Sequence, residues 1–104
     1  MEIRNSYYES ELRNLTTQIV VPLRHKEVNE QAFNRLFQLL DELIPVIKKE
    51  ELINRNIAGL LFFIYTQLET QAAYSSEMQA EPIRQKRTHL LSYLRKVFGD
   101  VREN

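Results

Sequence analysis

Apolar residues that recur every three or four positions constrain this chain more than any other feature. Residues with this spacing lie on one face of an α-helix, so the pattern marks a face that is buried against other elements. Four segments show it, and we predict helices over residues 6–20, 29–48, 51–71 and 81–98. Four amphipathic helices with short links pack most economically as an all-α, antiparallel up-down-up-down four-helix bundle.

The composition agrees with long helices in one globular domain, residues 1–104. The chain has only two Gly and three Pro, and 43% of its residues are apolar. It has no Cys, which excludes disulfides and thiolate metal sites. The longest apolar run, Ile57–Tyr65, is well short of the roughly 20 residues that span a membrane. The N-terminus shows no apolar signal segment, so we expect a cytoplasmic protein.

Capping residues and prolines predict the ends of the first two helices. Ser6-Tyr7-Tyr8-Glu9 matches a capping box, which predicts that the first helix begins at Ser6. Pro22 is predicted to end it. Asn29 is the predicted cap of the second helix. Pro45 predicts either a kink in that helix or its end near Leu43.

The links around the last two helices are predicted from charge and turn residues. Lys48-Lys49-Glu50-Glu51 predicts a tight corner, because lysines suit a helix C-terminus and glutamates the next N-terminus. Residues 73–80 are predicted as a hairpin, with Pro82 in the first turn of the fourth helix. Gly99 is a natural helix stop, and residues 100–104 are expected to fray.

The apolar stripes predict the core. Leu40, Leu61 and Leu94 should be almost fully buried. The third segment carries apolar residues on several sides and is therefore predicted as the most buried helix. Its aromatic group could line a ligand pocket, although core packing is the preferred interpretation; the group is Phe62, Phe63 and Tyr65. Gly59, which costs about 1 kcal/mol in a helix, is interpreted as allowing close contact with a neighbouring helix.

No arrangement of residues points to an enzyme. His25 and His89 lack the spacing of a helical metal pair, and no phosphate loop or nucleophile motif occurs. The 14 acidic residues are scattered and nominate no catalytic pair. We therefore predict no catalytic, cofactor-binding or metal-binding residues and no small-molecule substrate. A small enzyme with an unrecognised carboxylate site is left as a minor hypothesis.

The charge distribution is the one asymmetric surface feature. Fourteen basic residues balance fourteen acidic ones, so nucleic acid is not an expected partner. Residues 82–104 nevertheless hold six basic and two acidic residues. This is either a solvated helix face or a surface for an anionic partner. The candidate partner-binding residues on the fourth helix and the hairpin before it are Tyr74, Arg84, Lys86, Arg87, Arg95 and Lys96.

The second half of the chain also resembles a known family. It contains Leu52-Ile53-Asn54-Arg55, an apolar stretch with Leu60, Phe62 and Tyr65-Thr66, a polar hairpin, and a basic helix that ends in Phe98-Gly99-Asp100. This arrangement is similar to the enterocin A immunity protein family, which protects against pediocin-like bacteriocins. The resemblance is best over Glu51 to Asp100, and the first half agrees in its pattern only.

The resemblance implies a cytoplasmic four-helix bundle that protects a producing cell from its own pore-forming peptide. The implied partner is the membrane receptor with bound bacteriocin, a permease of the mannose phosphotransferase type, and contact with the inner membrane surface would accompany it. The part that selects the bacteriocin would correspond to Tyr74–Asp100. The alternative is another cytoplasmic helical adaptor or regulator that binds an anionic partner through its basic fourth helix.

Overall fold

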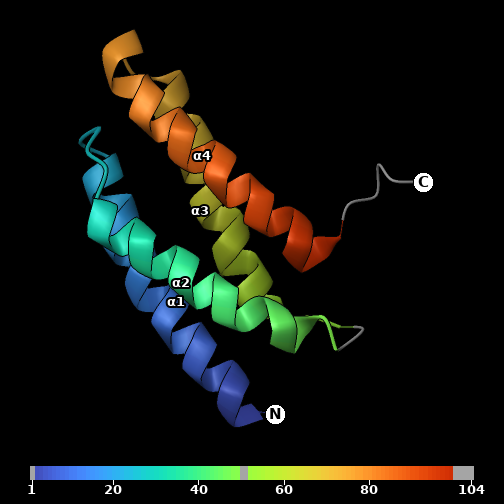
Figure 1. Ribbon diagram of the computed structural model, residues 1–104. Helices are drawn as coiled ribbons and strands as arrows, with labels where there is room; N and C mark the ends of the chain where they lie inside the picture. Colours follow the sequence, from blue (N-terminus) through green and yellow to red (C-terminus); the bar gives the residue numbers. More distant parts are fainter. Residues whose placement is uncertain (1, 50–51, 100–104) are drawn as a thin grey trace.

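The chain forms the predicted bundle. The computed structural model describes residues 2–49 and 52–99, with side chains from Ser6 onward. Over these residues there are four helices and no strand: α1 (Glu2–Leu23), α2 (Glu30–Ile47), α3 (Arg55–Ala73) and α4 (Glu77–Phe98). Successive helices run in opposite directions, so the all-α, up-down-up-down bundle predicted from the sequence is confirmed (Figure 1).

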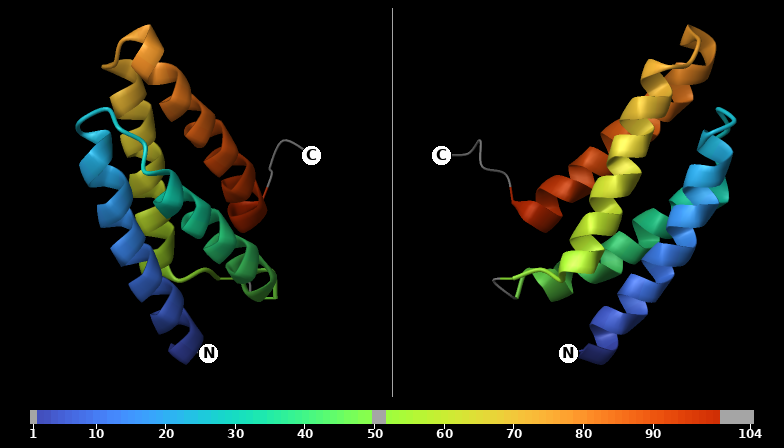
Figure 2. Two further views of the ribbon diagram at one scale, coloured as in Figure 1. Left: turned by 60° about the vertical axis from the view of Figure 1, so that its left-hand side comes forward. Right: turned by 180° about the vertical axis from the view of Figure 1, so that it is seen from behind.

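The order of the helices around the bundle differs from their order in the chain. α1 packs against α2 and α3, while α4 packs against α3 and α2. The link between α2 and α3 therefore joins diagonal helices, and the views from two sides agree with this arrangement (Figure 2). As a result α4 has two different flanks, one towards α3 and one towards α2, and the packing towards α2 is the less extensive.

The predicted stripes form the core. The stripe of α1 is buried as predicted, and Leu40 of α2 and Leu61 of α3 are fully buried. The core residues that the stripes predict correctly are Tyr8, Leu12, Leu15, Ile19, Phe33, Leu36, Phe37, Leu40, Leu43, Ile44, Ile57, Leu61, Ile64, Leu68, Ile83, Leu90 and Val97. Three-four spacing therefore found most of the buried face of each helix.

α1 is longer than predicted at both ends. It begins at Glu2 rather than at Ser6, so Ser6 lies inside the helix and is not its cap. It also continues through Pro22 to Leu23. Pro22 has no N–H for the carbonyl of Gln18, but the side-chain amide of Asn29 donates a hydrogen bond to that carbonyl over 3.3 Å. This substitute donor explains why Pro22 does not end the helix.

α2 has the predicted cap but runs past its proline. The side chain of Asn29 accepts a hydrogen bond from the N–H of Ala32, as expected of an N-cap. The helix does not end near Leu43, because it continues through Pro45 to Ile47. Pro45 leaves the carbonyl of Asp41 without its helical donor. Asp41 is exposed, so water can supply that donor instead.

α3 and α4 begin at caps that the sequence interpretation did not use. α3 begins at Arg55 after the cap Asn54, whose side chain accepts from the N–H groups of two following residues. The predicted start near Glu51 is wrong, because the described residues 52–54 are not helical; Glu50 and Glu51 of the predicted corner lie outside the described residues. α4 begins at Glu77 after the cap Ser76, which places Pro82 in its second turn. The predicted hairpin over 73–80 is thus a short link, residues 74–76.

Helix α4 ends where the sequence predicts. Gly99 has φ of 86°, a left-handed value that costs glycine little and other residues more. The predicted fraying of residues 100–104 concerns positions outside the described part of the chain.

Three predictions about burial are wrong. Leu94 is only partly buried, because it lies on the α3 flank of α4 rather than in the centre of the bundle. Phe98 lies on the same flank and is 48% exposed, although it was predicted to face the core. α3 is not the most buried helix, since Phe62 and Phe63 are 67% and 40% exposed. Leu52, in the link before α3, is exposed as well. The surplus apolar residues of the third segment therefore face solvent instead of adding to the core.

Candidate interaction site between α3 and α4

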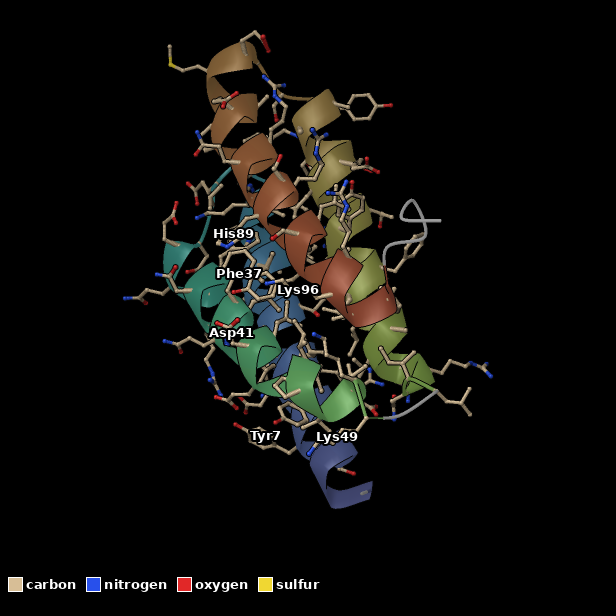
Figure 3. The ribbon with its side chains drawn as sticks, turned by 45° about the vertical axis from the view of Figure 1, so that its right-hand side comes forward. Tyr7, Phe37, Asp41, Lys49, His89 and Lys96 are labelled. Carbon is tan, nitrogen blue, oxygen red and sulfur yellow. The ribbon has the colours of Figure 1, made fainter. Side chains whose placement is uncertain are left out.

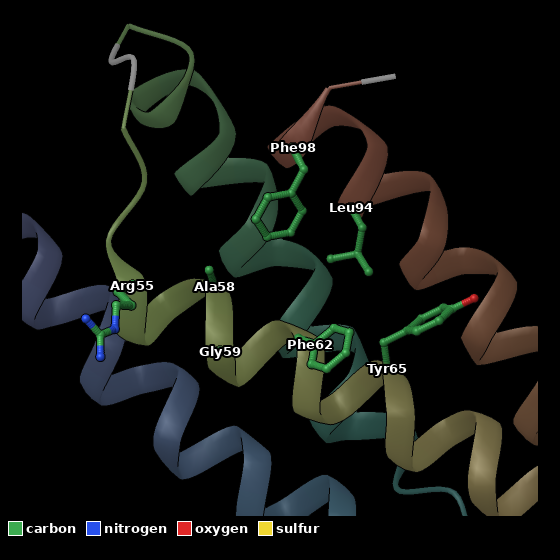
Figure 4. Close-up of a pocket in the computed structure, with 7 residues that line it drawn as sticks. All are labelled: Arg55, Ala58, Gly59, Phe62, Tyr65, Leu94 and Phe98. Atoms are coloured by element: carbon green, nitrogen blue, oxygen red, sulfur yellow. The ribbon is translucent and has the colours of Figure 1, made fainter. Parts of the chain in front are cut away.

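An open apolar groove lies between α3 and α4. Its volume is about 660 Å³, and α3 supplies more of its lining than α4 does. The lining residues are Arg55, Ala58, Gly59, Phe62, Tyr65, Leu94 and Phe98. Figure 4 shows Leu94 and Phe98 directed from α4 towards α3, with Phe62 and Tyr65 on the opposite wall.

Helical spacing places these side chains together. Ala58, Phe62 and Tyr65 follow one another at intervals of four and three, so they form one line along α3. Leu94 and Phe98 are four residues apart and form the matching line on α4. This line on α3 lies on a different side from the core residues of the same helix, which are Ile57, Leu61, Ile64 and Leu68. The helix is thus apolar on two sides, one for the bundle and one for the groove.

Gly59 leaves a space in the wall of the groove. A Cβ atom at this position would meet no atom within 4 Å, apart from its own helix. The predicted close contact with a neighbouring helix is therefore wrong. A glycine inside a helix costs about 1 kcal/mol relative to alanine, and no packing within the described structure compensates for that cost here.

Arg55 lies at the end of the groove where α3 begins. The cap Asn54 fixes this end of the helix by accepting hydrogen bonds from the N–H groups of Asn56 and Ile57. The guanidinium of Arg55 is turned away from Phe98 and Leu94 (Figure 4). Its position gives the otherwise apolar groove a cationic end.

The predicted basic residues do not form one surface. At about 100° per residue, Arg84, Arg87 and Arg95 fall on the same side of α4 as the groove residues Leu94 and Phe98. Lys86 and Lys96 fall on the flank towards α2. The predicted residues therefore lie on two flanks of α4, because this helix packs against α3 on one side and α2 on the other.

Lys86 belongs to the packing between α4 and α2. Its ammonium group lies 2.6 Å from the carboxylate of Glu30 and 5.7 Å from the ring centre of Phe33, and its side chain is only 19% exposed. A cation held by a carboxylate and an aromatic ring of its own chain is poorly available to a partner. We therefore assign Lys86 a structural role.

An aromatic cluster occupies the same flank. The rings of His89 and Tyr93 lie 3.9 and 5.2 Å from that of Phe37, centre to centre, and Lys96 lies over the ring of Tyr93. Burial, with a smaller contribution from the nearby carboxylate of Asp41, raises the pKa of Tyr93. His89 is exposed, and its ring packs against that of Phe37 (Figure 3).

Two further candidates lie away from the middle of the groove. Arg84 contacts two carboxylates of its own helix, Glu77 at 3.1 Å and Glu81 at 3.6 Å. Tyr74 is the C-cap of α3, at the opposite end of that helix from Arg55, and it is 79% exposed. None of the six residues predicted from the sequence lines the groove. Arg87 and Arg95 are on the same side of α4 as the groove residues and form no ion pair with another described residue.

The groove itself was not predicted from the sequence as a site. Phe62 and Tyr65 were considered as a possible pocket, but packing in the core was preferred. Arg55, Gly59 and Phe98 were not predicted to take part. The sequence feature that could have indicated the groove is the second line of apolar residues on α3, because a helix needs only one apolar side to face the core.

Other kinds of site find little support in the described part of the chain. No group of three or more His, Asp or Glu residues there could hold a metal ion. Thr16 is the one buried polar residue found there, and its hydroxyl donates to the carbonyl of Leu12. None of the described helices is both long and apolar enough to cross a membrane.

Comparison with known proteins gives no relative. No protein-family model, curated protein or solved structure matches the chain.

Proposed function

We propose that this chain is an immunity protein against a pediocin-like bacteriocin. It would protect the cell from the cytoplasmic side by acting on the membrane receptor, a permease of the mannose phosphotransferase type, with the bacteriocin bound. Two things support the proposal: the resemblance of residues 51–100 to the enterocin A immunity protein family, and the four-helix bundle that this resemblance implies.

One observation carries the proposal. The residues on which the resemblance rests include Arg55, Phe62, Tyr65 and Phe98, and all four line the same groove. They come from two helices, and Phe62 and Phe98 are too exposed to be explained by the core. Large exposed apolar side chains gathered in one place are typical of a binding surface.

The groove also suggests how the C-terminal part selects a bacteriocin. The segment Tyr74–Asp100 supplies Leu94 and Phe98, one wall of the groove, while α3 supplies the other. A change in the α4 wall would alter the shape of the groove without altering the core. Arg87 and Arg95, on the same side of α4 as this wall, provide positive charge for an anionic receptor surface or for the inner face of the membrane.

The test is protection of a sensitive strain. The chain is expressed in bacteria that carry the receptor, and these are challenged with a panel of pediocin-like peptides. We expect resistance to at least one peptide, and loss of it with Phe98→Ala. Lys86→Gln, which changes the flank towards α2, is the matched variant and should retain resistance at equal protein level.

A contrary result has a clear meaning. If the unmodified chain gives no resistance to any peptide of the panel, the immunity proposal is wrong. The arginines on the α3 side of α4, Arg87 and Arg95, then favour the alternative, a helical adaptor or regulator with an anionic partner. A neighbouring gene for a short peptide with a double-glycine leader would be expected under the first proposal and not under the second.

A further inference from the structure

We infer that the groove between α3 and α4 binds an acidic amphipathic helix of a partner protein. This inference deepens the proposed function, on which it rests for the biological partner. Three features of the structure lead to it: the length and lining of the groove, the charges around it, and the space at Gly59.

The lining of the groove suits a helix better than a small molecule. From Arg55 to Tyr65 the groove follows about 15 Å of α3, which is the length of about three helical turns. Small-molecule sites have a few convergent polar groups that orient the ligand. This groove has few polar groups, chiefly the phenolic hydroxyl of Tyr65 and the outward-turned guanidinium of Arg55. Apolar grooves of this kind accept the apolar face of an amphipathic helix.

The charges around the groove select an acidic partner. Arg55 lies at one end, and Arg87 and Arg95 lie on the groove side of α4. No carboxylate of a described residue lies within ion-pair distance of any of the three. On α3, Glu69 is the acidic residue that follows the groove line, one turn beyond Tyr65. Three guanidinium groups against one carboxylate complement a helix whose apolar face is bordered by Asp or Glu.

Gly59 gives the partner room to approach. Because nothing lies within 4 Å of a Cβ atom built there, a side chain of the partner can enter this space. The groove also suits an inserted side chain better than a flat membrane surface. A membrane accepts apolar side chains that protrude, whereas Leu94, on the α4 wall, is less exposed than Phe62 and Phe98 and can be reached by a side chain that enters between the two helices.

The experiment selects helical peptides on the full-length protein. A display library of 14-residue helices has Leu at positions 3, 6, 7 and 10, and its flanking positions vary among Glu, Gln and Lys. We expect selection to enrich Glu at the flanks. Affinities of the selected peptides are then measured by fluorescence anisotropy at low and high salt.

Two test variants and two control variants locate the binding site. Gly59→Leu fills the groove and should weaken binding at least tenfold, while its better helix propensity keeps the protein folded. Thr70→Leu, an exposed position about 16 Å further along α3, is the matched control and should bind normally. Arg87→Gln with Arg95→Gln should weaken binding about fivefold at low salt and much less at high salt. Arg24→Gln with Lys48→Gln removes the same charge elsewhere and should have no effect.

Several results would overturn the inference. These are selection of Lys or of no charge at the flanks, unchanged binding by Gly59→Leu, and self-association of the protein that Gly59→Leu abolishes. Binding to vesicles of anionic lipid that Gly59→Leu abolishes would show a membrane to be the occupant. These outcomes are separate from the strain test. Peptide binding without protection would contradict the proposed function alone, and protection without peptide binding would contradict this inference alone.

Discussion

Replacing Gly59 with Ala should make this protein more stable. Gly59 lies inside α3, so alanine gains about 1 kcal/mol of helix propensity there. Steric cost should be absent, since the new methyl group would have no neighbour within 4 Å. For a domain of this size 1 kcal/mol corresponds to a rise in melting temperature of about 5 °C. Circular dichroism at 222 nm measures this directly.

The adjacent residue provides the control. Ala58 is in the same turn of α3 and also lines the groove, so Ala58→Gly should lower the melting temperature by a similar amount. Opposite shifts in the two variants would show that propensity dominates at both positions. A fall in melting temperature for Gly59→Ala would refute the reasoning, because it would mean that something occupies the space beside Gly59 in solution.

Two other predictions test the core and the flank towards α2. Leu61→Ala should lower the free energy of unfolding by about 2–5 kcal/mol, because Leu61 is fully buried. Leu94→Ala, at the partly buried groove wall, should lower it by only about 1 kcal/mol. Urea denaturation measures both losses, and equal losses would contradict the assignment of Leu61 to the core and Leu94 to the groove wall. The raised pKa of Tyr93 means that the folded protein holds the phenolic proton more tightly than the unfolded chain does. This stability is present below the ordinary tyrosine pKa of 10.0 and is lost as the pH rises through the pKa of Tyr93 in the folded protein. Tyr93→Phe should therefore reduce the loss of stability at alkaline pH, as measured by urea titrations. Tyr74→Phe, at an exposed tyrosine, should not reduce it.

The number of helices and their buried faces could be predicted because burial follows the helical period. Helix ends were harder to predict, because some depend on contacts between distant residues. Pro22 is the clearest case, since the donor that lets α1 continue comes from Asn29, outside the helix. Nothing within α1 itself shows that this hydrogen bond forms.

The candidate site could be predicted only in part, because it needs the order of helices around the bundle. Sequence alone shows that α4 is basic, but not that Arg87 and Arg95 lie towards α3 while Lys86 lies towards α2. The same limit applies to Phe62. A large aromatic residue in an apolar helix is usually buried, and only the packing of α3 shows that this one is not.

The cost that the groove places on the fold is an argument for a partner. Phe62 and Phe98 are exposed to water, and Gly59, which lies near both in the groove, lowers the stability of α3. A simple substitution at each of the three positions should raise the free energy of unfolding. Exposed apolar residues also occur elsewhere on these helices, as Phe63 and Met78 show, but in the groove two of them, Phe62 and Phe98, lie on facing helices beside a glycine that weakens its helix. This combination is expected where binding as well as folding determines the residues. The comparison of Gly59→Ala with Gly59→Leu separates the two demands, since both should stabilise the helix and the larger side chain should interfere more with binding.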